Sequence, residues 1–170
     1  HYVSAVKANI LRQLESVNII DISHNIPTFN VLHAAFVLKN VYKDFPPGSI
    51  HIIGVNAESN EKTPHIAVYA DEHYFIGTDN GLFSLLLDIK PDKIVHITTS
   101  IESDNENFPI KDVFVKAACH IARGGTLELI GSPADDFMDK SSKLVALHER
   151  NSIRGSIVHI DHYGNVITNI

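Results

Sequence analysis

The alternation of apolar and polar residues predicts four helices separated by short apolar strands. Apolar residues three or four apart predict a first helix over residues 2–14 and a second over residues 28–38, where Thr28 can cap the helix. A short helix begins at residue 82, and the last helix covers residues 112–121, where two glycines follow it. β-branched and apolar runs predict strands at residues 17–22, 50–55, 66–70, 74–77, 94–98, 156–160 and 166–170.

The order of these elements predicts an α/β fold. Helices alternate with strands as far as residue 125, which indicates an α/β layer with a mostly parallel sheet. A polar, acidic loop is expected at residues 100–107. Residues 151–170 contain two strands around a Gly-Asn turn and predict the start of a second, β-rich domain. Both ends of the chain fall inside a helical or strand pattern, so we expect an excerpt of a longer protein with residues 1–150 as its N-terminal domain.

Composition narrows the range of partners. Hydrophobic residues make up 44% and charged residues 20% of the 170 residues, a balance typical of a soluble globular domain. The net charge is −6 and lysine and arginine do not cluster, so we expect neither nucleic acid nor a membrane as a partner. The sequence has no apolar run near the ~20 residues of a membrane span and no apparent signal peptide, so the expected location is the cytoplasm. A single cysteine, Cys119, excludes an internal disulfide.

Two dense polar turns are candidates for ligand contacts. Residues 78–81 read Thr-Asp-Asn-Gly between a strand and a helix. They are either a turn that caps the helix or a ligand-facing turn in which Asp79 and Asn80 make hydrogen bonds. Residues 161–165 read Asp-His-Tyr-Gly-Asn and combine a carboxylate, an aromatic ring and an amide. This set can hold a cationic amine and a flat base, and the alternative is a plain hairpin turn with glycine at positive φ.

Eleven histidines raise the question of a metal site. His159, Asp161 and His162 are close in sequence, and the first two would share one face of a strand. However, the sequence has no HExxH or comparable ligand spacing. It also has no P-loop, GxSxG or strand-associated GxGxxG motif. We therefore expect neither a metal nor a bound cofactor.

Four segments follow one another in the order of a known family. They read Asp-Ile-Ser-His-Asn-Ile-Pro at residues 21–27, Phe-Pro-Pro-Gly-Ser-Ile-His at 45–51, Asp-Asn-Gly-Leu at 79–82 and Ile-Asp-His-Tyr-Gly-Asn-Val-Ile-Thr-Asn-Ile at 160–170. In these segments the chain resembles the S-adenosyl-L-methionine (SAM) hydroxide adenosyltransferases, relatives of the fluorinase and chlorinase. The resemblance covers nearly the whole chain. It would place the family's Thr-Asp-Phe-Gly segment, with the first strand, before residue 1.

The resemblance implies a three-layer N-terminal α/β domain, followed from residue 151 by the start of a truncated C-terminal β-barrel domain. It also implies a homotrimer in which SAM lies between the N-terminal domain of one subunit and the C-terminal domain of its neighbour. In the usual reaction of the family, water or halide attacks the ribose C5′ and methionine leaves. The residues expected to bind this nucleoside ligand are Asp161 at the methionine amine, Tyr163 and Asn165 at the adenine, Phe108 at the ribose, and Asp79 and Asn80 in the turn at 78–81.

The residues that position and activate water in hydrolytic members of the family are replaced in this sequence. The family's Asp, Arg and His positions fall at Asn56, Thr63 and Pro109, none of which ionises near neutral pH. Ile110 stands where the family has glycine, so we expect it to crowd the approach of the nucleophile. The catalytic residues therefore cannot be assigned by resemblance. Charged residues nearby that could replace them are Glu58, Glu61 and Lys111.

Three functions are compatible with the sequence. The first is a SAM hydrolase-like enzyme with a rebuilt site, which releases adenosine and methionine. The second is a SAM- or adenosine-binding protein without turnover, acting as a sensor or carrier, because loss of general-base assistance and of water positioning each costs orders of magnitude in rate. The third is a structural trimer without a ligand. The family resemblance favours the first function, and the three substitutions favour the second.

Overall fold

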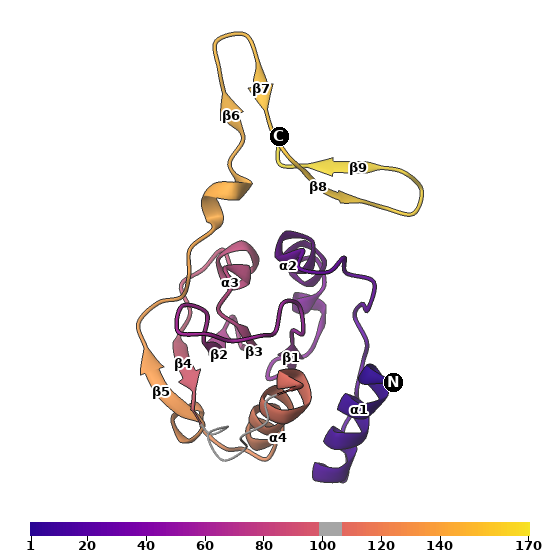
Figure 1. Ribbon diagram of the computed structural model, residues 1–170, viewed down its shortest axis with the longest axis vertical. Coiled ribbons are helices and arrows are strands. Elements are labelled where there is room, and N and C mark those ends of the chain that lie inside the picture. Colours follow the sequence, from indigo (N-terminus) through magenta and orange to yellow (C-terminus); the bar gives the residue numbers. More distant parts are fainter. Residues whose placement is uncertain (99–106) are drawn as a thin grey trace.

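The computed structural model describes residues 1–98 and 107–170 and shows a layered α/β arrangement (Figure 1). A five-stranded sheet forms the middle layer, in the order β1-β3-β2-β4-β5. Its strands are β1 (Ile50–Ile52), β2 (His65–Ala70), β3 (His73–Thr78), β4 (Lys93–Ile97) and β5 (Gly131–Ala134). The predicted α/β class is confirmed. The acidic loop expected at residues 100–107 lies almost entirely outside the described residues.

The sheet is mixed, which corrects the prediction of a mostly parallel sheet. β1 and β3 are parallel neighbours, whereas β2 pairs antiparallel with both β3 and β4, and β4 pairs antiparallel with β5. The cause is local at the β2–β3 connection, where Asp71 and Glu72 both have left-handed φ angles, of 51° and 63°. A two-residue turn of this kind joins antiparallel strands, because parallel neighbours need a crossover of a dozen or more residues.

Helices cover both faces of the sheet, which makes three layers (Figure 1). On one face, α2 and α3 pack on Phe75 and Val68 of the sheet. On the other face, Phe114 and its neighbours in α4 pack on Ile76 and Val95, and α1 lies against α4. None of the helices in the described ranges is long and apolar enough to cross a membrane. The helical elements are α1 (Tyr2–Gln13), α2 (Val31–Lys39), η1 (Tyr42–Asp44), α3 (Leu82–Leu86), η2 (Ile110–Phe114, a π-helical turn), α4 (Val115–Ala122), η3 (Leu127–Leu129) and η4 (Ser141–Leu144).

Two predicted elements before β1 differ in the structure. Helix α2 begins after its N-cap Asn30, whose Oδ1 accepts a hydrogen bond from the backbone N–H of His33 at 2.9 Å. Phe29 adopts a φ of 63°, which ends any helical path from Thr28. Residues 17–22 pair with no strand in the described part of the chain, so the strand predicted there is wrong. Part of this segment instead packs against the cluster formed by α1 and α4.

The C-terminal residues form two small hairpins that project from the α/β layer (Figure 1). β6 (Leu147–His148) pairs with β7 (Ile153–Arg154), and β8 (Ile157–Ile160) pairs with β9 (Val166–Thr168). The predicted strand pair around residues 161–165 is confirmed. The described strands of this region close no barrel, so the C-terminal β-barrel and the domain boundary at residue 151 stay predictions.

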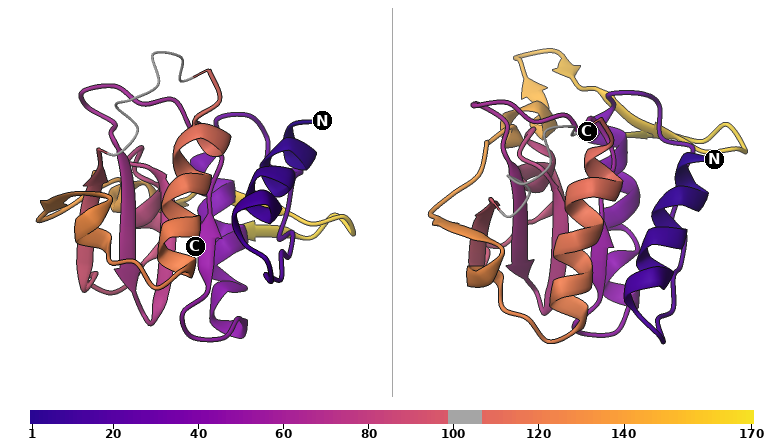
Figure 2. Two further views of the ribbon diagram at one scale, coloured as in Figure 1. Left: turned by 90° about the horizontal axis from the view of Figure 1, so that it is seen from below. Right: turned by 60° about the horizontal axis from the view of Figure 1, so that its bottom comes forward.

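The strand directions bring several loops to one edge of the sheet. β1 and β3 are parallel, and both β3 and β4 are antiparallel to β2. Therefore the carboxyl ends of β1, β3 and β4 and the amino end of β2 share an edge. The β1–β2 loop and the beginning of the η2–α4 helix lie at that edge (Figure 2). This is the usual place for ligand contacts in α/β proteins.

Candidate functional site

The loop between β1 and β2 is folded back onto the strand ends by side-chain hydrogen bonds. The amide nitrogen of Asn80 donates to the carbonyl oxygens of Val55 and Asn56, both at 3.1 Å. Nε2 of His65, at the start of β2, donates to the carbonyl oxygen of Ala57 at 2.8 Å. The loop is therefore tied to β2 and to the turn after β3. These hydrogen bonds fix the path of the loop relative to the sheet.

The turn at residues 78–81 is buried and its predicted ligand contacts already have partners within the chain. Asp79 and Asn80 are 7% and 3% exposed. Both carboxylate oxygens of Asp79 accept from the backbone N–H of Met138, at 2.8 and 3.0 Å, and burial raises the pKa of this carboxyl group. Oδ1 of Asn80 accepts from the N–H of Leu82. These contacts describe a turn that organises the loops around it, and direct ligand binding by Asp79 or Asn80 stays a prediction.

The three positions predicted to correspond to the family's catalytic residues, Asn56, Thr63 and Pro109, lie in loops at the same edge of the sheet. Asn56 lies just after β1 with a φ of 53°, and Thr63 forms an isolated bridge with Asn60 at the base of the loop. Pro109 immediately precedes η2, whose first residue, Ile110, lies against Gly54, two residues after β1. A catalytic role for these positions stays a prediction. The groups found there are an amide, a short hydroxyl and a proline ring.

Ile110 fills the space beside this group. A Cβ atom added to Gly54 would lie only 2.6 Å from Cδ1 of Ile110, so the isoleucine packs directly on the glycine backbone. Ile110 and Ala57 both pack on the hydrophobic cluster of the α4 face. The Gly54 contact is missed by the sequence reading, although a glycine that ends an apolar strand often marks a close approach.

The candidate replacement residues differ in their surroundings. Glu58 and Glu61 are exposed on the β1–β2 loop. Lys111 is half-buried, and its ammonium lies 3.3 Å from the carboxylate of its neighbour Asp112. A catalytic role for any of the three stays a prediction.

The turn at residues 161–165 is organised by its own carboxylate. Oδ1 of Asp161 accepts from the backbone N–H of Tyr163 and of Asn165, both at 2.9 Å, and Oδ2 accepts from the side-chain amide of Asn165 at 2.7 Å. The bonds from Asn165 are the main reason that the pKa of Asp161 is lowered, so the carboxylate is charged at neutral pH. Tyr163 is 81% exposed, and Gly164 supplies a φ of 85°. The turn therefore presents a fixed anion beside an exposed aromatic ring, which His162 contacts at a centroid distance of 3.8 Å.

The structure does not bring the two halves of the predicted site together within one chain. The turn at residues 161–165 lies at the tip of the β8–β9 hairpin, which points away from the β1–β2 loop (Figure 1 and Figure 2). Phe108 stays near the loop edge, where its ring meets Tyr2 edge-on at a centroid distance of 5.3 Å. Tyr2 is a neighbour of the site that sequence reasoning missed, because nothing local links residues this far apart. Within the described residues, no three His, Cys, Asp or Glu side chains converge as metal ligands would.

The fold and these loops define an α/β protein with a candidate ligand site at the carboxyl ends of its strands. The family description "SAM hydroxide adenosyltransferase N-terminal domain" matches residues 1–131, and the chain belongs to this family. This confirms the family inferred from the four sequence segments.

Individual relatives agree with the family match. The chain is 33% identical over 178 residues to the (R)-S-adenosyl-L-methionine hydrolase of Methanocaldococcus jannaschii. This alignment covers 99% of this chain and 62% of that relative. It is 25% identical to the protein of the same name from Thermus thermophilus, with 99% and 69% covered. A crystal structure of an uncharacterized conserved protein from Thermotoga maritima aligns with a TM-score of 0.85 and 28% identity, over the whole chain and 66% of that protein. The chain thus spans less than two-thirds of the first of these relatives.

Proposed function

We propose that the full-length protein binds SAM and hydrolyses it at the ribose C5′ to adenosine and methionine. In this reaction the water oxygen forms a bond to C5′, the C5′–S bond breaks with its electron pair going to the methionine sulfur, and one proton is released. The observation that carries the proposal is the organised turn at residues 161–165, in a chain of this family. The names of the two curated relatives support SAM as the ligand.

The geometry of the turn fits the parts of SAM. Asp161 accepts three hydrogen bonds from its own turn and is anionic, and a carboxylate has about four lone-pair sites, so it can also accept from the methionine ammonium. The exposed ring of Tyr163 offers a stacking surface for adenine, and Asn165 contacts the polar edge of the base. Phe108, on the loop side, lines the ribose.

The complete site in this proposal needs a second subunit. The β8–β9 turn and the β1–β2 loop face different directions in one chain, so a neighbouring copy must supply one of them (Figure 1). We therefore propose a homotrimer with SAM at the subunit interface. SAM is the substrate and no further cofactor takes part. We place the protein in the cytoplasm.

A second candidate function is binding of SAM without turnover. The packing of Ile110 on Gly54 favours it, because an apolar side chain occupies the space beside the substituted positions. Asn56, Thr63 and Pro109 cannot act as a general base at neutral pH. In this case the protein acts as a sensor or carrier of SAM.

The experiment that tests the proposal measures binding and turnover on one sample of full-length protein. SAM binding is followed by calorimetry and adenosine release by chromatography. Hydrolysis predicts adenosine above the uncatalysed rate, with a loss of about tenfold or more in Glu58→Gln or Glu61→Gln if the exposed loop carries the general base. Binding with adenosine at the uncatalysed rate supports the second candidate. Absence of SAM binding contradicts both.

A gain-of-function variant separates the two candidates further. This variant carries four substitutions that restore the family's residues at the edge of the sheet: Asn56→Asp, Thr63→Arg, Pro109→His and Ile110→Gly. If the native protein binds without turnover, this variant gains adenosine release. Ile110→Gly alone is the matched control, since it opens space without adding a group that activates water.

A further inference from the structure

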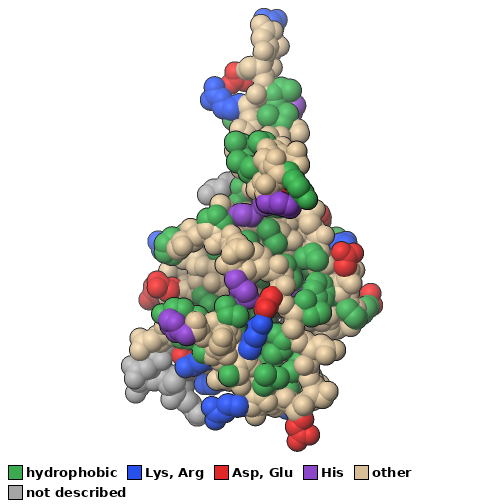
Figure 3. All heavy atoms as spheres, turned by 90° about the vertical axis from the view of Figure 1, so that its right-hand side faces the viewer, with side chains coloured by type: hydrophobic (Ala, Val, Ile, Leu, Met, Phe, Trp, Pro, Cys, Tyr) green, Lys and Arg blue, Asp and Glu red, His purple; other side chains and the backbone are tan. Residues whose placement is uncertain are grey.

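The β8–β9 hairpin is attached to the α/β layer through a pair of histidines. Nδ1 of His159 in β8 lies 2.8 Å from Nε2 of His33 in the first turn of α2, and their ring centroids are 4.7 Å apart. The His159 ring also stacks on Phe36, one turn further along α2, at 5.1 Å and 25°. Histidine side chains are visible where the C-terminal strands meet the rest of the molecule (Figure 3). One polar contact thus joins residues 126 positions apart.

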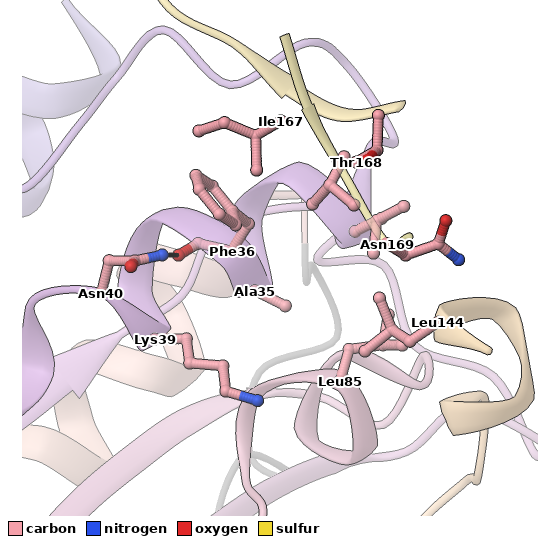
Figure 4. A pocket seen from close by; sticks show the side chains of 11 residues that line it. Ala35, Phe36, Lys39, Asn40, Leu85, Leu144, Ile167, Thr168 and Asn169 are labelled. Carbon is pink, nitrogen blue, oxygen red and sulfur yellow. Dashed lines mark hydrogen bonds between the residues drawn. The ribbon is translucent and has the colours of Figure 1, made fainter. Parts of the chain in front are cut away.

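The hairpin lies over a cavity that borders the histidine pair. This cavity of about 440 Å³ lies between α2, α3, η4 and the hairpin, with Phe36 and Ala35 on one side and Ile167 and Thr168 on the other (Figure 4). Beside this cavity, His159 joins the hairpin to α2 through its hydrogen bond to His33 and its stacking on Phe36.

We propose that the His33–His159 contact is a proton-sensitive dock, which holds the β8–β9 hairpin on α2 at neutral pH and releases it on acidification. When both rings are neutral, one N–H donates to the unprotonated nitrogen of the other. One added proton can be shared as N–H⁺···N. A second proton leaves two cationic donors facing each other across 2.8 Å, with no acceptor between them.

The surroundings of His33 on α2 favour this response, whereas the carboxylate of Asp161 on the hairpin opposes it by stabilising a proton on the pair. His33 lies at the N-terminal end of α2, where the helix dipole disfavours a cation, and the first turn reads Val-Leu-His-Ala, without an acidic residue. Burial, and then the neighbouring His159, lower the pKa of His33. On the hairpin side, Asp161 lies within electrostatic reach of His159, and the far end of α2 carries Lys39, paired with Asp88. His162 packs on Tyr163 instead of on the pair.

The direction of the pH effect follows from linkage. A histidine whose pKa is lowered in the docked state binds fewer protons when docked than when free. Docking is therefore fully favoured above the ordinary value of 6.5 and weakens as the pH falls below it. Where the undocked form binds one proton more than the docked form, the equilibrium constant for docking falls by up to tenfold for each pH unit of acidification. If the proposed function holds, the affinity for SAM should also fall on acidification, since the hairpin carries the turn at residues 161–165.

The test needs no ligand and is therefore independent of the proposed function. Hydrogen–deuterium exchange of the full-length protein is measured at pH 7.5 and pH 5.0 and corrected for the intrinsic exchange rates. We expect protection of residues 157–168 to fall about tenfold or more at the lower pH, while protection of β2 and β3 is retained. Equal corrected protection of the hairpin at both pH values would overturn the proposal.

Three variants assign the effect to the pair. In His33→Gln the side-chain amide can still bond to His159 but does not titrate, so the hairpin keeps its protection at both pH values. His159→Gln repeats the test from the other partner. His148→Gln, at an exposed histidine in β6, is the control and keeps the full pH response. A pH response that persists unchanged in both His33→Gln and His159→Gln contradicts the proposed dock.

Discussion

Replacing Asn80 with alanine tests whether the turn after β3 serves the fold. Its side chain makes three hydrogen bonds, two as donor to the Val55 and Asn56 carbonyls and one as acceptor from the Leu82 N–H. A neutral hydrogen bond contributes ~1 kcal/mol net, so Asn80→Ala should lower the free energy of unfolding by about 3 kcal/mol. At the 2–4 °C per kcal/mol typical of domains near this size, the midpoint of thermal unfolding falls by roughly 6–12 °C.

The assay is urea unfolding of the full-length protein followed by circular dichroism. Asn165→Ala is the matched control, because Asn165 also bonds through its amide, to Asp161, but is exposed and should cost less than about 1 kcal/mol. If Asn80→Ala changes the free energy of unfolding by less than about 0.5 kcal/mol, the structural role is refuted and ligand binding becomes the better explanation for Asn80. A large loss of stability supports the structural role.

Three further predictions follow from the packing and the buried titratable groups. Gly54→Ala should cost about 1–3 kcal/mol in urea unfolding, because its Cβ would meet Cδ1 of Ile110 at 2.6 Å, and Ile110→Val, which lacks that atom, should recover most of the loss. Burial and the neighbouring His73 lower the pKa of His51 to about 4, so the free energy of unfolding of the native protein should fall by up to about 3 kcal/mol between pH 6.5 and 4. His51→Leu should show a smaller fall when both proteins are unfolded with urea at these pH values. The pKa of Asp79 is raised in the folded protein, so its contribution to the free energy of unfolding is fully present below pH 3.8 and is lost as the pH rises through the higher folded value. Asp79→Asn should therefore become more stable relative to the native protein between pH 4 and pH 7. A difference in stability that stays constant over this range would contradict the reasoning.

The layers of the fold and the hairpin turn at residues 161–165 could be predicted from sequence because their signals are local. Apolar periodicity located α1, α4 and the central strands, and the Asp-His-Tyr-Gly-Asn segment marked the hairpin turn that the structure shows. The direction of the strands was less accessible. The pair Asp71-Glu72 carries no glycine or asparagine, so its left-handed turn and the antiparallel β2–β3 pairing were not apparent.

The remaining errors and omissions concern long-range contacts. Residues 17–22 have strand-like composition, but a strand exists only where a neighbour supplies hydrogen bonds, which the described chain does not do. The contact of Ile110 with Gly54 and that of His33 with His159 join segments far apart in sequence. Their partners are set by tertiary packing, and no local pattern encodes them.

The central claim is that the turn at residues 161–165 binds SAM, and a calorimetric titration of full-length protein with SAM tests it most directly. Asp161→Asn keeps the size of the side chain and an oxygen acceptor but removes the charge that would meet the methionine ammonium. Asp139→Asn is the control, since Asp139 is exposed and also accepts from its own turn, at the N–H of Ser141. The account predicts saturable binding to the native protein and to Asp139→Asn, and binding at least about tenfold weaker to Asp161→Asn. Equal affinity of all three proteins, or no binding of SAM to the native protein, would contradict it.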